Sequence, residues 1–473
     1  MEQIIQQIVS DLVEKVLNRI ERGEIQDLDA LSDGCLEDCR KAAAGIITAA
    51  IFLINDNVRK DKRLRKELGL RMQQHDRDRS VLTSLGEIKY KRDYYMEEAS
   101  GQYCFPIDKL LKVSSYERVS KGICAELVNL AADVSYQKSA DIVSGGSVSR
   151  QTVKNKIKET GILEKGISDR KKDVEELHIH ADEDHAHIQK YRKRGKESKI
   201  VPYIVLTEGI ESVYRSRNRT VSPVHFADKD LDGKALWAKT SAYIYGTYEH
   251  AEDVPIYIHS DGGSWIKGWK EELPNAVPIM DMFHFRKELK QANRRVPEAM
   301  LSSIIFNNIA LEDEKKARER CISAVNEAVR LAKEEKTKKK LKEFRTYLRN
   351  NWEGIRNSFR LETSGSCTEG QISHGLSERI SRNPMGWSRE GVGLMAMLRA
   401  YRKNGCRVKA ADFRRNDKEK ESSKLIEYGQ KICQEALAGR RNWSLFTGEG
   451  YVFDTSSGTQ QLLKIIGKAG QVM

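Results

Sequence analysis

The stretch Val254-Pro-Ile-Tyr-Ile-His-Ser-Asp-Gly-Gly-Ser-Trp-Ile266 decides how the rest of this sequence is interpreted. Residues 256–258 are apolar and predict a buried strand that stops at Asp261. Gly262-Gly263 then turns the chain into a helix that opens at Ser264. A carboxylate at the carboxyl end of a core strand, followed by a tight glycine turn, is well placed to hold a ligand or a metal.

A second segment, Ala276-Val-Pro-Ile-Met-Asp-Met-Phe-His284, repeats this plan a short distance along the chain. A short apolar strand again ends in an acid, Asp281, and His284 follows it. Two acidic strand ends in succession are hard to explain by packing alone. They predict the centre of a metal-dependent site, because carboxylate oxygens are the ligands that hard divalent cations prefer.

The composition narrows the class of protein. A chain of 473 residues with a net charge of +13 predicts several domains and a polyanionic partner. It has no run of 18 apolar residues, so we predict no transmembrane helix and no membrane partner. Its amphipathic start is not that of a signal peptide. The eight cysteines form no pair of CxxC motifs, which favours reduced thiols in a cytoplasm.

The chain divides into five predicted regions. A helical N-terminal region, with a basic run at 59–66, is followed by a small β-hairpin and a helix-turn-helix, which together form a DNA-binding region. A catalytic core then follows, interrupted by an all-helical insertion, and the last region is a basic C-terminal extension. In order, the predicted bounds are 1–80, 81–162, 172–289 with 363–402 for the core, 290–362 for the insertion, and 403–473.

The helix-turn-helix is predicted from residues 135–158. Residues 135–143 form one short helix, Ser144-Gly-Gly146 a turn, and residues 148–158 a second helix, capped by Ser149 or Ser147. Val153 and Ile157 would face the first helix. The side chains then free to contact DNA are Arg150, Gln151, Lys154, Asn155 and Lys158. An ordinary helical hairpin is the alternative interpretation.

The order of elements predicts the fold of the core. Strands are expected at 177–184, 200–206, 221–226, 255–260 and 277–280, with helices at 233–248 and 265–273. The resulting order β-β-β-α-β-α-β matches an RNase H-like core. We therefore predict an α/β protein with an RNase H-like catalytic core.

Such a core, with acids on its first and fourth strands and on a late helix, is built to hold two divalent ions for an in-line displacement at phosphorus. Mg²⁺ prefers hard oxygen ligands and keeps several waters, so three carboxylates suffice. Asp182 ends the first strand and Asp261 the fourth. Glu369, on a helix beyond the insertion, is the predicted third ligand.

Several alternatives stay open. Asp184 lies two residues from Asp182 on the same face of a strand and is its rival. Glu378 is the rival of Glu369, and both cannot reach one metal pair. Asp281 and His284 are expected beside the metal ligands, where His284 could orient a carboxylate or contact the phosphate of the cut strand. A buried histidine without catalytic role is the alternative for His284.

With these residues assembled, the sequence resembles the ISLre-type family of bacterial insertion-sequence transposases, which sit near the Mutator-like DDE transposases. The matching strings are Ala181-Asp-Glu-Asp-His185, Tyr257-Ile-His-Ser-Asp-Gly-Gly-Ser-Trp-Ile-Lys267, Asp281-Met-Phe-His-Phe-Arg-Lys-Glu-Leu289, Glu369-Gly-Gln-Ile-Ser-His374 and Pro384-Met-Gly-Trp-Ser388. The spacing of Asp281 and His284 is similar to a Mutator-like signature. Related motifs often have Asp-Gly-Ala where this chain has Asp261-Gly-Gly263.

The resemblance implies a DDE-type DNA transposase, an enzyme that cuts and joins DNA at the ends of its own element with Mg²⁺ or Mn²⁺. The implied partners are the terminal inverted repeats and target DNA, and two ends must meet, so a homo-oligomer is expected on DNA. A catalytically inactive DNA-binding regulator and an RNase H-like nuclease are the alternative functions.

Overall fold

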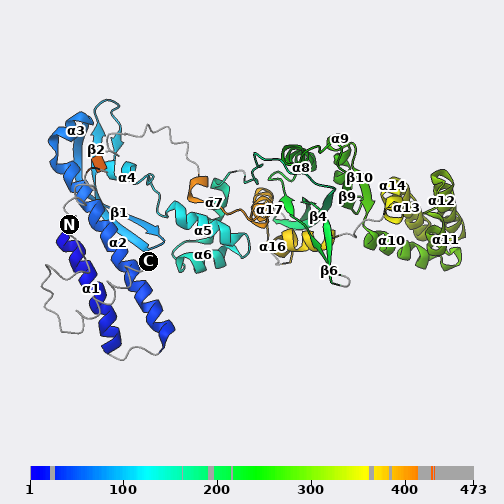
Figure 1. Cartoon of the computed structure of the whole chain (residues 1–473), viewed down its shortest axis with the longest axis horizontal. Helices are drawn as coiled ribbons and strands as arrows, with labels where there is room; N and C mark the ends of the chain where they lie inside the picture. The colour runs from blue at the N-terminus through cyan, green and yellow to red at the C-terminus, as the bar shows by residue number, and fades with distance from the viewer. Residues whose placement is uncertain are drawn as a thin grey trace. The chain divides into compact units, whose positions relative to one another are not determined.

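A computed structural model describes residues 2–21, 27–161, 163–189, 196–214, 217–361, 367–382, 386–413, 428–429 and 431. The chain forms two compact units, one of residues Met1–Ile123 with Arg415–Met473 and the other of Cys124–Arg414 (Figure 1). The division falls inside helix α5 (Lys121–Ala131). Both helices and sheets occur, and the predicted mixed α/β class is confirmed.

The first unit packs helices on a three-stranded antiparallel sheet. Its elements are α1 (Glu2–Glu21), α2 (Leu28–Lys60), α3 (Lys62–Glu67), β1 (Leu70–Thr83), β2 (Gly86–Glu97), β3 (Tyr103–Cys104) and α4 (Pro106–Leu110). Ile51 and Ile54 of α2 pack with Val81, Ile88 and Tyr90 of the hairpin. Apolar spacing along α2 thus gives this unit its core.

The hairpin differs from the prediction in its position. The strand β1 begins at Leu70, inside the range predicted as helical, and Thr83 pairs with Gly86 across a two-residue turn. The alternation of the sequence predicts two strands, at 83–95 and 101–107, around a glycine-containing turn, so the observed turn at Ser84-Leu85 falls inside the first predicted strand. The sequence from 110 to 132 predicts one helix, but α5 begins only at Lys121.

Helix α2 is long and apolar enough to cross a membrane by length and composition, a candidate that the sequence prediction missed. Its C-terminal half is held to the sheet by a buried ion pair. Arg59 donates from Nε to Asp93 Oδ2 (2.7 Å) and from Nη2 to Asp93 Oδ1 (2.8 Å), and Asp93 is fully buried. The first residue of the basic run therefore has a structural partner.

The second unit is built on a five-stranded mixed sheet. Its strands are β4 (Leu177–Gln189), β5 (Lys196–Thr207), β8 (Val224–Phe226), β9 (Ile256–Ser260) and β10 (Val277–Met280), in the spatial order β10-β9-β4-β5-β8. β4 runs antiparallel to β5 and parallel to β9, and β9 runs parallel to β10. The extra hairpin of β6 (Ile210–Tyr214) and β7 (Arg217–Thr220) was not predicted.

One face of this sheet carries the main apolar core. Alternate residues of β4, namely Leu177, Ile179 and Ala181, pack against α8 (Gly233–Thr247), η1 (Trp265–Gly268) and α9 (Trp269–Glu272). Trp237 of α8 is fully buried in this layer. Because side chains alternate along a strand, residues 178, 180 and 182 must point to the opposite face.

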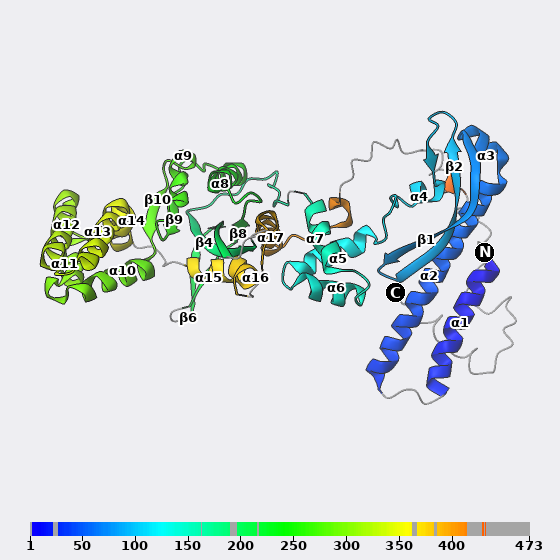
Figure 2. The same cartoon turned by 180° about the vertical axis from the view of Figure 1, so that it is seen from behind.

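The opposite face is covered by the late helices of the chain (Figure 2). They are α15 (Thr368–Ile372), the π-helical turn η3 (Ser373–Ser377), α16 (Glu378–Ile380) and α17 (Arg389–Lys403). Buried Arg399 of α17 donates to the carbonyl oxygens of Gly375 (2.9 Å) and His374 (2.6 Å). This guanidinium ties α17 to the π-helical turn.

The predicted helical insertion is helical throughout its described residues. It contains α10 (Met282–Arg295), η2 (Pro297–Ala299), α11 (Leu301–Asn308), α12 (Glu314–Leu331), α13 (Glu335–Asn350) and α14 (Trp352–Arg360). One continuous apolar cluster, from Phe285 through Leu341 to Ile355, joins these helices. The insertion therefore has a core of its own.

Helix α14 returns to the sheet and covers its edge strand β10. Ser358 Oγ accepts from the N–H of Met280 (2.9 Å), and the amide of Asn357 donates to the carbonyl of Pro278 (3.0 Å). These side chains bond backbone groups that would otherwise be unpaired at a sheet edge. The insertion is thereby fixed beside the ends of β9 and β10.

Candidate functional site

Three aspartates stand in a row across three parallel strands. Asp261 and Asp281 directly follow β9 and β10, but Asp182 lies inside β4, which continues to Gln189, so the prediction that Asp182 ends the first strand is wrong. Ala181 of β4 is level with Ser260 of β9, and Ser260 is level with Met280 of β10. The next residues along each strand are Asp182, Asp261 and Asp281. Since neighbouring strands lie about 4.8 Å apart, Asp261 is one strand spacing from each of the other two. The register of the sheet therefore brings these acids together.

Asp182 is the most perturbed of the three. Its burial raises the pKa of the carboxyl to about 6, against the opposing effect of a hydrogen bond from the N–H of Glu183. The negative charge of Asp261 raises this pKa further, and His284 lowers it. A cation held between the two carboxylates would relieve their repulsion, and such a perturbed acid in a polar row is typical of functional sites.

Asp261 is held by the turn that follows it. Its Oδ1 accepts a hydrogen bond from the N–H of Gly263 (3.0 Å). Gly262 has a φ of +88°, and a Cβ there would lie 2.5 Å from Oδ1 of Asn351, which belongs to the helical insertion. A glycine is required at 262 both for its backbone conformation and for this close approach.

Asp281 and His284 extend the row onto α10. Asp281 caps this helix by accepting from the N–H of Phe283 (2.8 Å), and its own N–H donates to the carbonyl of Ser260 (2.8 Å). Nδ1 of His284 lies 3.6 Å from Oδ2 of Asp281. That nitrogen is buried and has no hydrogen-bond partner within the described residues. His284 thus lies beside Asp281 with an unused ring nitrogen, and it also lowers the pKa of Asp182.

The neighbours of Asp182 on β4 have different surroundings. Asp184 pairs with Val201 of β5, beyond the end of β9, and one of its buried oxygens, Oδ2, has no hydrogen-bond partner within the described part of the chain. Glu183 points to the other face, where Nε1 of Trp265 donates to its Oε2. The sequence prediction missed Glu183, although strand alternation places it beside the glycine turn.

The third predicted ligand is not joined to this row. Thr368, immediately before Glu369, lies against β4, with its Oγ1 3.0 Å from Nδ1 of His180. The side chain of Glu369 is nevertheless exposed. Among the residues that the structure describes, no cluster of three or more His, Cys, Asp and Glu has the geometry to hold a metal. The strand register therefore brings Asp182 and Asp261 together, and no hydrogen bond or ion pair among the described residues joins Glu369 to them, so its role as third ligand stays a prediction.

The rival acid, Glu378, already has partners. His374 Nδ1 lies 2.7 Å from its Oε1, and Arg399 Nη2 lies 3.5 Å from its Oε2. The hydrogen bond from His374 is the main cause that lowers the pKa of Glu378. These contacts engage both carboxylate oxygens of Glu378, so this side chain is not free to bind a metal without losing them.

Three buried histidines lie on the same face of the sheet as Asp182. His178 Nδ1 is 2.9 Å from His259 Nε2, and the rings of His259 and His180 stack at 4.9 Å. Burial lowers the pKa of His180 to about 3 and that of His259 well below its usual value. At neutral pH these two rings carry no charge, so they support the site as packing and hydrogen-bonding groups.

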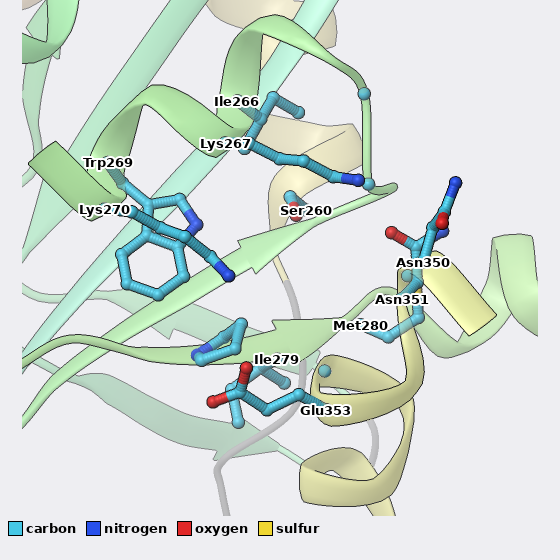
Figure 3. Close-up of a pocket in the computed structure, with 14 residues that line it drawn as sticks. Ser260, Ile266, Lys267, Trp269, Lys270, Ile279, Met280, Asn350, Asn351 and Glu353 are labelled. Atoms are coloured by element: carbon cyan, nitrogen blue, oxygen red, sulfur yellow. The ribbon is translucent and has the colours of Figure 1, made fainter. Parts of the chain in front are cut away.

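The helical insertion contributes residues that sequence reasoning missed. The hydroxyl of Tyr347 on α13 donates to the sulfur of Met280 (3.4 Å), the residue before Asp281, and burial raises the pKa of this hydroxyl, with smaller contributions from the charges of Asp261, Glu288 and Asp281. A cavity of about 60 Å³ adjoins the turn and is lined by Lys267 on one side and Asn351 on the other (Figure 3). Only tertiary contact identifies Tyr347 and Asn351, since they lie 86 and 90 residues from Asp261 in sequence.

The two helices predicted to read DNA are present as α6 (Tyr136–Ser144) and α7 (Arg150–Glu159). Ser149 caps α7 by accepting from the N–H of Thr152, and Val153 and Ile157 are buried as predicted. The predicted DNA-contacting side chains Arg150, Gln151, Asn155 and Lys158 are exposed, and Lys154 is half-buried. Lys158 forms an ion pair with Glu390 of α17, and Gln151 donates to Asn155 (3.0 Å).

Comparison with known proteins places the chain in a family. Residues 23–417 match the model of an uncharacterised protein family, UPF0236, and the chain belongs to that family. A UPF0236 protein of Caldanaerobacter subterraneus subsp. tengcongensis is 36% identical over 361 residues, which cover 76% of this chain and 74% of that protein. Another from the same organism is 34% identical over 401 residues, covering 84% and 81% of the two chains.

Proposed function

We propose that this chain is a DDE-type DNA transposase with an RNase H-like catalytic core. The observation that carries the proposal is the register of the parallel strands β4 and β9, which sets Asp182, within β4, beside Asp261, directly after β9. The raised pKa of Asp182 accompanies this pairing. An acid pair of this kind suits phosphoryl transfer, in which negative charge must be balanced at the reacting phosphate.

The sheet supports the core assignment. In chain order, the first strand pairs with the second and the fourth, the second with the third, and the fourth with the fifth. Only the second strand is antiparallel to the rest of the sheet, and helices follow the third and fourth strands. This arrangement supports the RNase H-like fold that we propose from the order β-β-β-α-β-α-β, and its register sets Asp182 beside Asp261.

The names of the relatives support the proposal that a mobile element encodes this protein. One name joins eleven designations from one organism, and the next joins four. Many designations for one protein in one organism indicate many gene copies. Such copies are expected when an element copies or moves its own gene. A housekeeping enzyme has no such reason to recur.

The donor set fits Mg²⁺ or Mn²⁺, since Asp182 and Asp261 offer hard carboxylate oxygens and repel each other without a cation. In the proposal these two residues and Glu369 hold two ions, which supply charge stabilisation to an attacking and a leaving oxygen. His284, with its unused ring nitrogen, would orient Asp182 or the phosphate of the cut strand. The glycine turn fixes the direction of the Asp261 carboxylate.

The remaining parts of the proposal concern DNA and assembly. We propose that α6 and α7 form a helix-turn-helix that contacts the terminal inverted repeats through Arg150, Gln151 and Asn155. Two ends would be joined in a homo-oligomer in the bacterial cytoplasm. Helix α7 buries Val153 and Ile157 on one face, and these three side chains are exposed.

The test is incubation of the full chain with Mg²⁺ and a plasmid that carries the element's ends. Strand transfer supports a transposase, hydrolysis alone supports a nuclease, and binding without cleavage supports an inactive regulator. Asp261→Asn should abolish cleavage but keep end binding, while Asp253→Asn, at an exposed loop residue, serves as the charge-matched control. Full cleavage by the Asp261→Asn variant would overturn the site.

A further inference from the structure

The exposed face of α10 carries an unusual combination of side chains. Four cations and an aromatic ring share one side of the helix, while Phe285, Leu289 and Ala292 are buried on the other. The exposed set is Phe283, Arg286, Lys287, Lys290 and Arg294. At 100° per residue these positions fall within one stripe.

The cations of this stripe have no acidic partners. Within the described part of the chain, no ion pair or hydrogen bond is formed by the side chains of Arg286, Lys290 or Arg294. Helix α13 of the same insertion is equally basic, but its Lys338 and Lys340 pair with Glu335 and Glu343. Unpaired positive charges aligned on one face are typical of a surface that binds a polyanion.

The apolar member of the stripe has no packing role. The ring of Phe283 is 63% exposed, and it stands edge-on to His284 with ring centres 5.6 Å apart. A hollow of about 520 Å³ runs along the stripe from Met282 to Arg294. An exposed aromatic ring at the end of a basic groove is suited to stacking on an unpaired base.

The stripe begins at the aspartate row. Asp281 caps α10, and its N–H is bonded to Ser260 at the end of β9. From Phe283 to Arg294 the helix advances about 16 Å, close to five nucleotide steps along one strand. The one acid of α10, Glu288, lies off the stripe and acts on Tyr347. The cations thus lead directly away from Asp182 and Asp261.

We propose that this face of α10 binds the DNA strand that leaves the aspartate row, with Phe283 stacked on an unpaired base beside the reacting phosphate. The inference rests on the proposed function. It specifies that the DNA bound at the aspartate row is a junction of duplex and single strand. The cations contact successive phosphates and hold the strand without reading its sequence.

The test measures binding by fluorescence anisotropy in EDTA, so that it does not depend on cleavage. The probe is a labelled 20-base-pair duplex with a five-nucleotide single-stranded overhang, compared with the same duplex with blunt ends. One variant carries Arg286→Gln, Lys290→Gln and Arg294→Gln. Its charge-matched control carries Lys336→Gln, Lys339→Gln and Lys342→Gln on exposed positions of α13.

The α10 triple variant should bind the overhang probe at least tenfold more weakly, and its slope of log K against log salt should fall by about 2, because two to three phosphate contacts are lost. The α13 triple variant should keep the affinity and slope of the unaltered chain. Phe283→Leu should weaken overhang binding about tenfold and leave blunt-duplex binding unchanged, since stacking requires an unpaired base.

Equal losses in the two triple variants, or tighter binding of an RNA of the same sequence, would overturn the α10 proposal while the proposed function stands. If the unaltered chain binds neither probe at 50 mM salt, the proposed function fails together with it. The altered positions are exposed, and thermal unfolding of each variant within about 2 °C of the unaltered chain establishes that folding is kept.

Discussion

The adjacent strands that position Asp182 and Asp261 differ from the helical segment that carries Glu369 and Glu378 in how these acids are held in place. The two aspartates follow residues that pair across neighbouring strands, so backbone hydrogen bonds set their separation. The two glutamates lie on α15 and α16, which side-chain packing holds against β4. Backbone register aligns acids without further support, whereas a packed helix places them according to its rotation.

The largest expected effect tests this contrast directly. Asp182→Asn and Asp261→Asn should each lower Mg²⁺-dependent cleavage on the order of a thousandfold, because each removes a proposed ligand. Glu369→Gln should match them if α15 brings this residue to the metal. Glu378→Gln should lose less than about tenfold, since His374 and Arg399 already engage that carboxylate. The measurement is the rate of plasmid cleavage by each variant. A larger loss of rate in Glu378→Gln than in Glu369→Gln would reverse the assignment of the third ligand.

The next prediction concerns the turn that links the strand end to the insertion. Gly262→Ala should destabilise the second unit by about 2–3 kcal/mol, because alanine is strained at a φ of +88° and its Cβ would meet Asn351. Gly263→Ala is the matched control and should cost less than about 1 kcal/mol, since its Cβ would find 3.3 Å or more to every neighbour.

Thermal unfolding of both variants, with Asn351→Gly added to each, separates the two causes in Gly262→Ala. Removal of the Asn351 side chain should restore part of the stability lost in Gly262→Ala and none of that lost in Gly263→Ala. Equal unfolding temperatures for the two alanine variants would contradict the tight approach of the insertion to this turn.

The smallest expected effect concerns the charge of Asp182. Its pKa of about 6 lies above the ordinary value of 3.8, so the folded protein holds this proton more tightly than the unfolded chain. The stability gained from protonation is full below about pH 4 and is lost as the pH rises through 6. Asp182→Asn should therefore stabilise the metal-free protein more at pH 8 than at pH 5, by about 1 kcal/mol.

The measurement is thermal unfolding in EDTA at both pH values, with Asp253→Asn as an exposed control. Addition of Mg²⁺ should raise the unfolding temperature of the unaltered chain at pH 8 and have a smaller effect on Asp182→Asn. A pH-independent difference between the two proteins would show that Asp182 is not perturbed by its neighbours.

Much of the second unit could be predicted from its sequence. The strands at 256–260 and 277–280, the helix from Gly233 and the helical insertion follow from apolar periods and glycine turns, and each is present with bounds close to the prediction. The hairpin at 70–97 was misplaced, because its first strand is mostly polar and its two turn residues, Ser84 and Leu85, are not glycine. Composition gave no sign of the β6–β7 hairpin either.

The late helix shows why a third ligand is harder to predict. An ideal α-helix across 368–379 would fix the rotation between Glu369 and Glu378, but a π-helical turn at Ser373–Ser377 intervenes. Such a turn adds a residue and changes which side chains face the sheet. Its position depends on contacts such as that of Gly375 with Tyr203, which are not visible in local sequence.

The sequence by itself determined which residues can form buried strands and that acids follow the strands at 256–260 and 277–280, but it ended the first core strand too early, at a position inside β4. A period of two and a glycine turn are local properties, and they act within a few residues. Tertiary structure alone decided that Asp281 is level with Asp261, that Asn351 and Tyr347 lie beside them, and that the cations of α10 lead away from this row. These relations depend on strand register and on the packing of an insertion, which join residues that are distant in the chain.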